Sequence, residues 1–137
     1  MVTIVDSSVV IAVQLPEPAS AACRTALLTA NEVHSTDLLG IELLNAASNM
    51  ARRRRQPWPI LIAMLDQATM LPIILMPHQP LLPAAATVCA ETGCAAYDAI
   101  LVALAQRAES PLLTLDARLG RTLAGTPWER WVRVIGG

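Results

Sequence analysis

The chain has 137 residues, of which 54% are hydrophobic and 15% charged, and its formal net charge is −1. This hydrophobic content excludes a disordered chain, and the near-neutral balance excludes a protein that binds nucleic acid through its overall charge alone. All 10 basic residues are arginine, and the absence of lysine excludes P-loop and Schiff-base chemistry.

The first residues predict a buried strand followed by a turn. Residues 2–6 are mostly apolar and rich in β-branched side chains, which favours a strand. Ser7 or Ser8 is expected to cap the turn that comes next. A helix is then predicted over residues 19–30, where alanine and leucine recur at helical spacing.

A long helix is predicted in the middle of the chain. A weak strand over residues 32–35 precedes it, and Thr36 or Asp37 is expected to cap it. The helix should end near Arg55, because the two prolines that follow cannot continue it.

Helices and strands alternate through the second half. This alternation predicts an α/β fold, a three-layer α/β/α sandwich with a mostly parallel central sheet. No linker of domain-boundary length is visible, so residues 1–137 are expected to form one domain. The predicted elements are a helix over 60–70, a strand over 72–76, a helix over 83–92 that Gly93 ends, a helix over 97–108, a strand over 112–115, a helix over 117–123 and a strand over 131–135.

Targeting and cysteine signals point to a cytoplasmic chain. The most apolar region, residues 60–76, is interrupted by polar residues, so no membrane span is expected, and no basic leader precedes the first strand. Cys23, Cys89 and Cys94 lack zinc-site spacing and are expected to be buried free thiols in a reducing compartment.

Four acidic residues stand where folding would bring them to one edge of the sheet. Asp6 ends the first strand and Asp116 follows another, whereas Asp98 opens a helix and Glu42 lies in the long helix. Ligands of open α/β sheets bind beyond the carboxyl ends of the strands. Clustered carboxylates repel one another, and a divalent cation relieves that repulsion. The pattern therefore predicts a metal site that activates water for attack on phosphate.

Polar neighbours accompany these acids. Thr114 stands two residues before Asp116, on the same side of a strand, and is expected to orient it or a metal-bound water. Asn45 shares a helical face with the glutamate and is expected to bind a neighbouring carboxylate or a phosphate. Ser8 stands two residues after Asp6 and is expected to do likewise.

Each acid also has a structural interpretation. Asp98 and Asp116 stand where helix caps are common, Asp6 fits a surface turn, and Glu42 fits a solvated helix face. Two other classes fit less well: a phosphoacceptor receiver domain needs a lysine, and a phosphatase with an aspartate nucleophile needs a second aspartate where Ser8 stands.

The segments around the acids resemble the four motifs of PIN domains. Residues 5–11 (VDSSVVI) resemble the opening motif and residues 42–46 (ELLNA) the central helix motif. Residues 97–105 (YDAILVALA) and 112–119 (LLTLDARL) resemble the third and fourth. The resemblance covers nearly the whole chain in the right order, and the small size resembles the VapC toxins of bacterial toxin–antitoxin pairs.

This resemblance implies an α/β/α sandwich and an endoribonuclease that uses Mg²⁺ or Mn²⁺ to cut structured RNA, such as transfer or ribosomal RNA. The family's metal-binding catalytic acids carry over to Asp6, Glu42, Asp98 and Asp116, and its hydroxyl position to Thr114. A homodimer and inhibition by a VapB-like antitoxin are also implied. The alternative is a non-catalytic PIN-like module that binds RNA or protein.

Basic residues outside the motifs are candidates for RNA contact. Arg52, Arg53, Arg54 and Arg55 are consecutive, and they either complement the dipole of the long helix or bind RNA phosphates. Arg118 has the same two interpretations, phosphate contact or an exposed helix face. The apolar helix predicted over residues 60–70 is either a dimer contact or part of the core.

Overall fold

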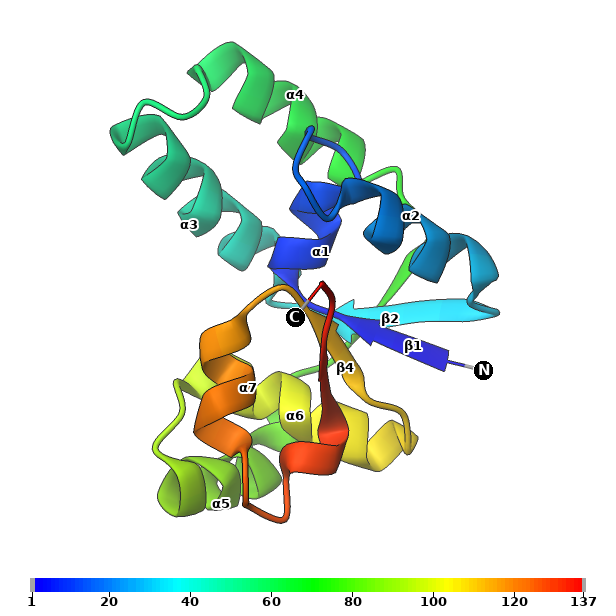
Figure 1. The fold of residues 1–137 in the computed structure, drawn as a ribbon, viewed down its shortest axis with the longest axis vertical. Coiled ribbons are helices and arrows are strands. Elements are labelled where there is room, and N and C mark those ends of the chain that lie inside the picture. Colours follow the sequence, from blue (N-terminus) through cyan, green and yellow to red (C-terminus); the bar gives the residue numbers. More distant parts are fainter. Residues whose placement is uncertain (1, 137) are drawn as a thin grey trace.

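A computed structural model describes residues 2–136 and places all its strands in one parallel sheet (Figure 1). The strand order is β3-β2-β1-β4-β5, and every neighbouring pair is parallel. The predicted α/β class is confirmed. The strands are β1 (Val2–Val5), β2 (Glu32–Thr36), β3 (Ile73–Met76), β4 (Leu112–Thr114) and β5 (Val132–Val134).

Helices cover both faces of this sheet (Figure 1). Successive strand residues point to opposite faces, so Ile4 and Leu112 pack into one apolar core and Val5 and Leu113 into the other. The first core is shared with α5 (Leu82–Thr92), α6 (Ala96–Ala108) and α7 (Ala117–Leu123), and the second with α1 (Ser7–Ala12), α2 (Ser20–Thr29), α3 (Leu39–Arg52) and α4 (Trp58–Ala68). Short 3₁₀ turns are η1 (Gln79–Leu81) and η2 (Glu129–Trp131).

The segment after β1 is a helix, which corrects the predicted turn. Asp6, and neither Ser7 nor Ser8, is the N-cap of α1, and its carboxylate accepts a hydrogen bond from the Val9 N–H at 3.2 Å. Local propensity favours the turn, because serine and valine are weak helix formers. Burial decides otherwise, since residues 9–12 all pack inside the second core.

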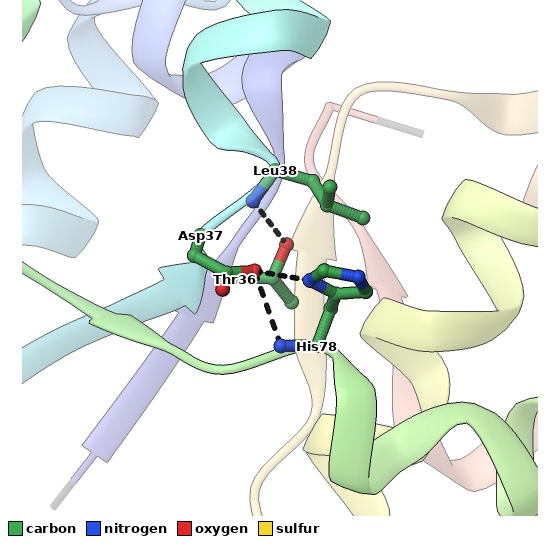
Figure 2. A network of polar contacts seen from close by, with 4 residues as sticks. All are labelled: Thr36, Asp37, Leu38 and His78. Carbon is green, nitrogen blue, oxygen red and sulfur yellow. Dashed lines mark hydrogen bonds and ion pairs between the residues drawn. The ribbon is translucent and has the colours of Figure 1, made fainter.

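The predicted caps of α3 serve another purpose (Figure 2). Leu38 is the N-cap residue, without a side-chain cap bond, while the Thr36 hydroxyl accepts from the Leu38 N–H at 3.3 Å. The Asp37 carboxylate accepts from the His78 backbone N–H at 3.1 Å and from its Nδ1 at 2.7 Å. These contacts join the end of β3 to the start of α3, and so help to fix the helix that carries Glu42.

The remaining predicted elements are present within a few residues of their expected bounds. Gly93 ends α5 with a φ of 72°, the left-handed conformation that glycine adopts without strain. The three cysteines are free, although only Cys23 is fully buried. No single helix within residues 2–136 has the length and apolar character to cross a membrane; Gln79–Thr92 and Ala96–Ala108 reach them only together, across a 115° bend.

Candidate active site at the carboxyl edge of the sheet

The strand order changes direction at β1, because the chain builds outward to β2 and β3 on one side and to β4 and β5 on the other. Such a switch point leaves a crevice beyond the strand ends where α/β proteins bind ligands. Asp6 follows the last residue of β1, and Asp116 stands two residues beyond β4. Pairing of Val5 with Leu113 therefore brings the two acids to the same edge.

Asp6 is the buried centre of this edge, with an exposed fraction of 8%. Its carboxylate accepts hydrogen bonds from the Ser8 and Thr114 hydroxyls and from the Val9 N–H. Burial raises the pKa of Asp6 above its ordinary value, and these hydrogen bonds oppose the rise. The surface-turn interpretation of Asp6 is therefore wrong.

Both hydroxyls that donate to Asp6 also accept from the chain that leaves β4. The Leu115 N–H donates to Ser8 Oγ at 3.0 Å, and the Asp116 N–H donates to Thr114 Oγ1 at 3.0 Å. The Thr114 hydroxyl thus accepts from the backbone of Asp116 and donates a hydrogen bond to the Asp6 carboxylate. The contact that it makes with Asp116 is through the backbone of that residue. This network joins β1, α1 and β4 around a single carboxylate.

Glu42 approaches from the first turn of α3. Its carboxyl oxygen Oε2 is buried without a hydrogen-bond partner among residues 2–136. Burial, with repulsion from Asp6 and then Asp98, raises the pKa of Glu42 to about 7. A solvated helix face would produce neither effect, so that interpretation is wrong.

Asp98 approaches from the opposite layer. Helix α6 runs back along the sheet between parallel strands, so its first turn lies at the carboxyl edge and carries Asp98. Burial, with repulsion from Asp116 and then Asp6, raises the pKa of Asp98 to about 6. Because α6 has no side-chain cap bond, the helix-cap interpretation of Asp98 is wrong.

Asp116 has a structural role beside any chemical one. It is the N-cap of α7, and its Oδ1 accepts from the Arg118 N–H at 2.9 Å and the Leu119 N–H at 3.3 Å. The side chain is exposed and lines a pocket of about 190 Å³ together with Asp98 and Arg118. The helix-cap interpretation of Asp116 is confirmed. The same pocket also contains the positively charged Arg118 and the carboxyl group of Asp98.

The donor chemistry of this edge fits a hydrated divalent cation. Within residues 2–136, no three or more acidic, histidine or cysteine side chains form a group arranged to hold a metal ion by themselves. Mg²⁺ does not need such a cage, because it keeps several waters and is commonly bound through one or two carboxylates plus a substrate phosphate. The unpartnered Oε2 of Glu42 and the mutual repulsion of the acids are what a cation would satisfy.

Other predicted residues lie apart from this cluster. Asn45 is exposed on α3, and none of the side-chain hydrogen bonds between described residues involves it. The arginines at positions 52–55 lie at the far end of α3, where the chain turns into α4 (Figure 1).

Cys94 was not predicted as a site residue, yet it lines the pocket with Asp98. The sequence signal that could have identified Cys94 is its position between Gly93, which ends α5, and the start of α6, which carries Asp98.

Comparison with known proteins identifies the family that this sequence matches. The sequence pattern of the PIN domain matches residues 3–123. Ribonuclease VapC3 of Pyrobaculum aerophilum is 32% identical over 121 residues, which cover 87% of this chain and 92% of that protein.

Solved structures share the fold. The crystal structure of PAE2754 from Pyrobaculum aerophilum has a TM-score of 0.68 at 22% identity, covering 90% of this chain and 81% of that one. VapBC2 from Rickettsia felis, bound to a DNA fragment from its promoter, has a TM-score of 0.64 at 13% identity, covering 98% and 99%. A toxin–antitoxin complex from Klebsiella pneumoniae has a TM-score of 0.62 at 15% identity, covering 96% of both chains.

Proposed function

Because this chain belongs to the PIN domain family, we propose that it is a metal-dependent endoribonuclease and the toxin of a toxin–antitoxin pair. The observation that carries the proposal is the buried Asp6 at the switch point of the sheet, with Glu42, Asp98 and Asp116 arriving from both layers. The ribonuclease activity in the name of the 32% identical relative supports RNA as the substrate.

The four acids would hold Mg²⁺ or Mn²⁺ partly through water. When bound, the cation would supply an activated water and offset the charge that develops on the phosphate. The Ser8 and Thr114 hydroxyls keep Asp6 in place and favour its ionised form, because both donate to its carboxylate. Glu42 and Asp98, whose pKa values are raised to about 7 and about 6, would release protons as the cation binds.

Arg118 is proposed to contact the RNA. It lines the pocket that contains Asp98 and Asp116, two of the acids that would bind metal. Arginine binds phosphate through two parallel hydrogen bonds. A phosphate drawn toward the acids would otherwise meet only negative charge there. Asn45 lies about one helical turn beyond Glu42 on α3, and it is proposed to bind a phosphate of the RNA.

Partner proteins are proposed from the apolar surface. Ile41 and Leu44 on α3 are 59% and 52% exposed, and Leu75 on β3 is 50% exposed. Leu44 and Leu75 line a groove of about 410 Å³ between α3, α4 and β3. Exposed apolar patches of this kind mark protein interfaces, which supports both a homodimer and an antitoxin.

We place the protein in the cytoplasm, where RNA is the available substrate.

The experiment that tests the nuclease is cleavage of total transfer RNA by purified protein in Mn²⁺, Mg²⁺ or EDTA. We expect cutting only with metal, and loss of cutting in Asp98→Asn with an unchanged circular dichroism spectrum. Asp66→Asn, which removes an exposed acid on α4, is the matched control and should cut normally. RNA that is bound but left intact by the wild-type protein in both metals would instead support the binding-module alternative.

The experiment that tests the toxin is induced expression in bacterial cells. Growth should stop with the wild-type chain and continue with Asp98→Asn. Where a small protein is encoded next to this gene, its co-expression should restore growth if it is the antitoxin. Continued growth with the wild-type chain, at a protein level equal to that of the variant, would contradict the toxin assignment.

A further inference from the structure

The turn between α3 and α4 carries a positive patch. We call it the arginine turn, residues Arg52, Arg53, Arg54 and Arg55, all of which are exposed. Among residues 2–136 the ion pairs within 4 Å are His34 with Glu32 and His78 with Asp37, so no arginine is paired with a carboxylate. Within the described part of the chain, the Arg52 guanidinium bonds to the neutral Asn49 side chain. The charge of Arg55 opposes the rise that burial causes in the pKa of Glu17, so these two residues lie within electrostatic range of each other.

The backbone of this turn is ordered in a conformation that suits glycine better than arginine. Arg54 has a φ of 54°, its N–H donates to Ala51 O at 3.0 Å, and the Arg55 N–H donates to Met50 O at 3.0 Å. These are the bonds of a Schellman motif, in which the left-handed residue is usually glycine. Local folding therefore does not account for an arginine here, and residues in sparsely populated backbone conformations cluster at functional sites.

The arginine turn is held at a fixed distance from the candidate site. Helix α3 runs without interruption from the turn that carries Glu42 to Arg52. A rise of about 1.5 Å per residue places these two positions about 15 Å apart along the axis. In Figure 1 the α3–α4 hairpin projects away from the sheet, with the arginine turn at its tip.

We propose that the arginine turn is a second RNA-binding site, which holds the phosphate backbone of a double-stranded stem while the segment to be cut lies at the acids. Four consecutive exposed arginines provide several guanidinium groups for a dense row of phosphates. A stem is favoured over a flexible single strand because two rigid partners lose less entropy when they meet at a fixed spacing. Protein contacts with double-stranded RNA are largely to its phosphates and shape.

This inference deepens the proposed function and rests on it for the position of the cut, but the binding itself requires no hydrolysis. The test therefore uses protein that carries Asp98→Asn, in EDTA, so that the RNA stays intact. The probe is a synthetic RNA hairpin whose stem makes one full helical turn. A single-stranded RNA too short to reach from the acids to the arginine turn is the comparison.

The first experiment compares two variants with equal loss of charge. R53Q/R54Q/R55Q removes the patch, and R24Q/R107Q/R133Q removes three exposed arginines elsewhere. We expect the first to weaken hairpin binding about tenfold or more and to lower the slope of log K against log salt by about 2 to 3. The control should retain most of the affinity, and it should leave cleavage of the short RNA unchanged when Asp98 is restored.

The second experiment uses Arg54→Gly, for which folding and binding should change in opposite directions. Glycine suits the left-handed position, so the melting temperature should rise. Loss of the guanidinium should weaken hairpin binding severalfold. A purely structural role for this residue would leave RNA affinity unchanged.

Each outcome decides the proposal. Equal affinities and salt slopes for the arginine-turn variant and its control would overturn it, as would a wild-type chain that does not bind the hairpin. A turn variant that binds RNA normally but no longer binds an acidic antitoxin would assign the patch to that protein and also overturn it. Hairpin binding that depends on the turn, in a protein that never cuts RNA with metal, would support this inference and contradict only the nuclease.

Discussion

Glu42→Gln should stabilise the metal-free protein at neutral pH. In the wild-type chain the pKa of Glu42 is raised from 4.5 to about 7, first by burial and then by repulsion from Asp6 and Asp98. Between these two values the folded protein holds a proton that the unfolded chain has released. Stability therefore falls as the pH rises through this window, and the full penalty is present above about pH 7.

The magnitude follows from the size of the shift. A change from 4.5 to about 7 corresponds to roughly 3 kcal/mol if taken in full. Glu42 is partly exposed, and solvent screening reduces the figure to roughly 1–2 kcal/mol. A change of 1 kcal/mol moves the melting temperature of a domain of this size by roughly 2–8 °C. Glutamine keeps the shape of the side chain and removes the charge.

Thermal unfolding in EDTA, at several pH values from 4 to 8, measures this effect. Glu42→Gln should melt above the wild-type protein near pH 8 and together with it near pH 4. Glu109→Gln, an exposed glutamate, should show no such divergence. Saturating Mn²⁺ should then stabilise the wild-type chain more than the variant. A pH-independent difference, or a variant that is less stable at pH 8, would refute the reasoning.

Three further changes have defined outcomes in the same unfolding assay. Asp98→Asn should also stabilise the metal-free protein near pH 8, by a similar amount, because the pKa of Asp98 is raised from 3.8 to about 6; a loss of stability there would contradict the repulsion. Thr114→Val should cost about 1–3 kcal/mol, since it removes a donor to the buried Asp6 carboxyl group and an acceptor for a backbone N–H. Thr114→Ser keeps the hydroxyl and should retain most of the wild-type stability. Gly120→Ala should cost about 1–3 kcal/mol, because the added Cβ would lie 2.8 Å from Val134 Cγ2, and Val134→Ala in the same chain should relieve the loss.

Local patterns were sufficient for the fold class and for the position of the acids. Strands buried on both faces must be apolar throughout, and helices between parallel strands must return to the same starting edge. Short apolar runs alternating with helical periods therefore predicted the sheet and its covering layers. The same rule placed Asp6, Asp98 and Asp116 at the carboxyl edge, because each stands at the end of a strand or the start of a returning helix.

The local patterns failed where distant segments decide the structure. Helix α1 exists because its apolar residues are buried against other elements, and propensity along the chain cannot report that burial. Asp37 was expected to cap a helix, but a carboxylate takes the best donors within reach, and His78 lies 41 residues further along the chain. Nothing in the sequence around Asp37 or His78 indicates that these two residues bind each other.

The sequence by itself determined which groups are available: four carboxylates, their hydroxyl neighbours and a run of arginines. Only the tertiary structure decided that Ser8 and Thr114 both donate to Asp6, that the Oε2 atom of Glu42 is buried without a hydrogen-bond partner among residues 2–136, and that the arginines lie a helix length away. The reason is physical. Side-chain chemistry is a property of each residue, whereas desolvation, repulsion and hydrogen-bond partners depend on distances that exist only after β1 and β4 have paired.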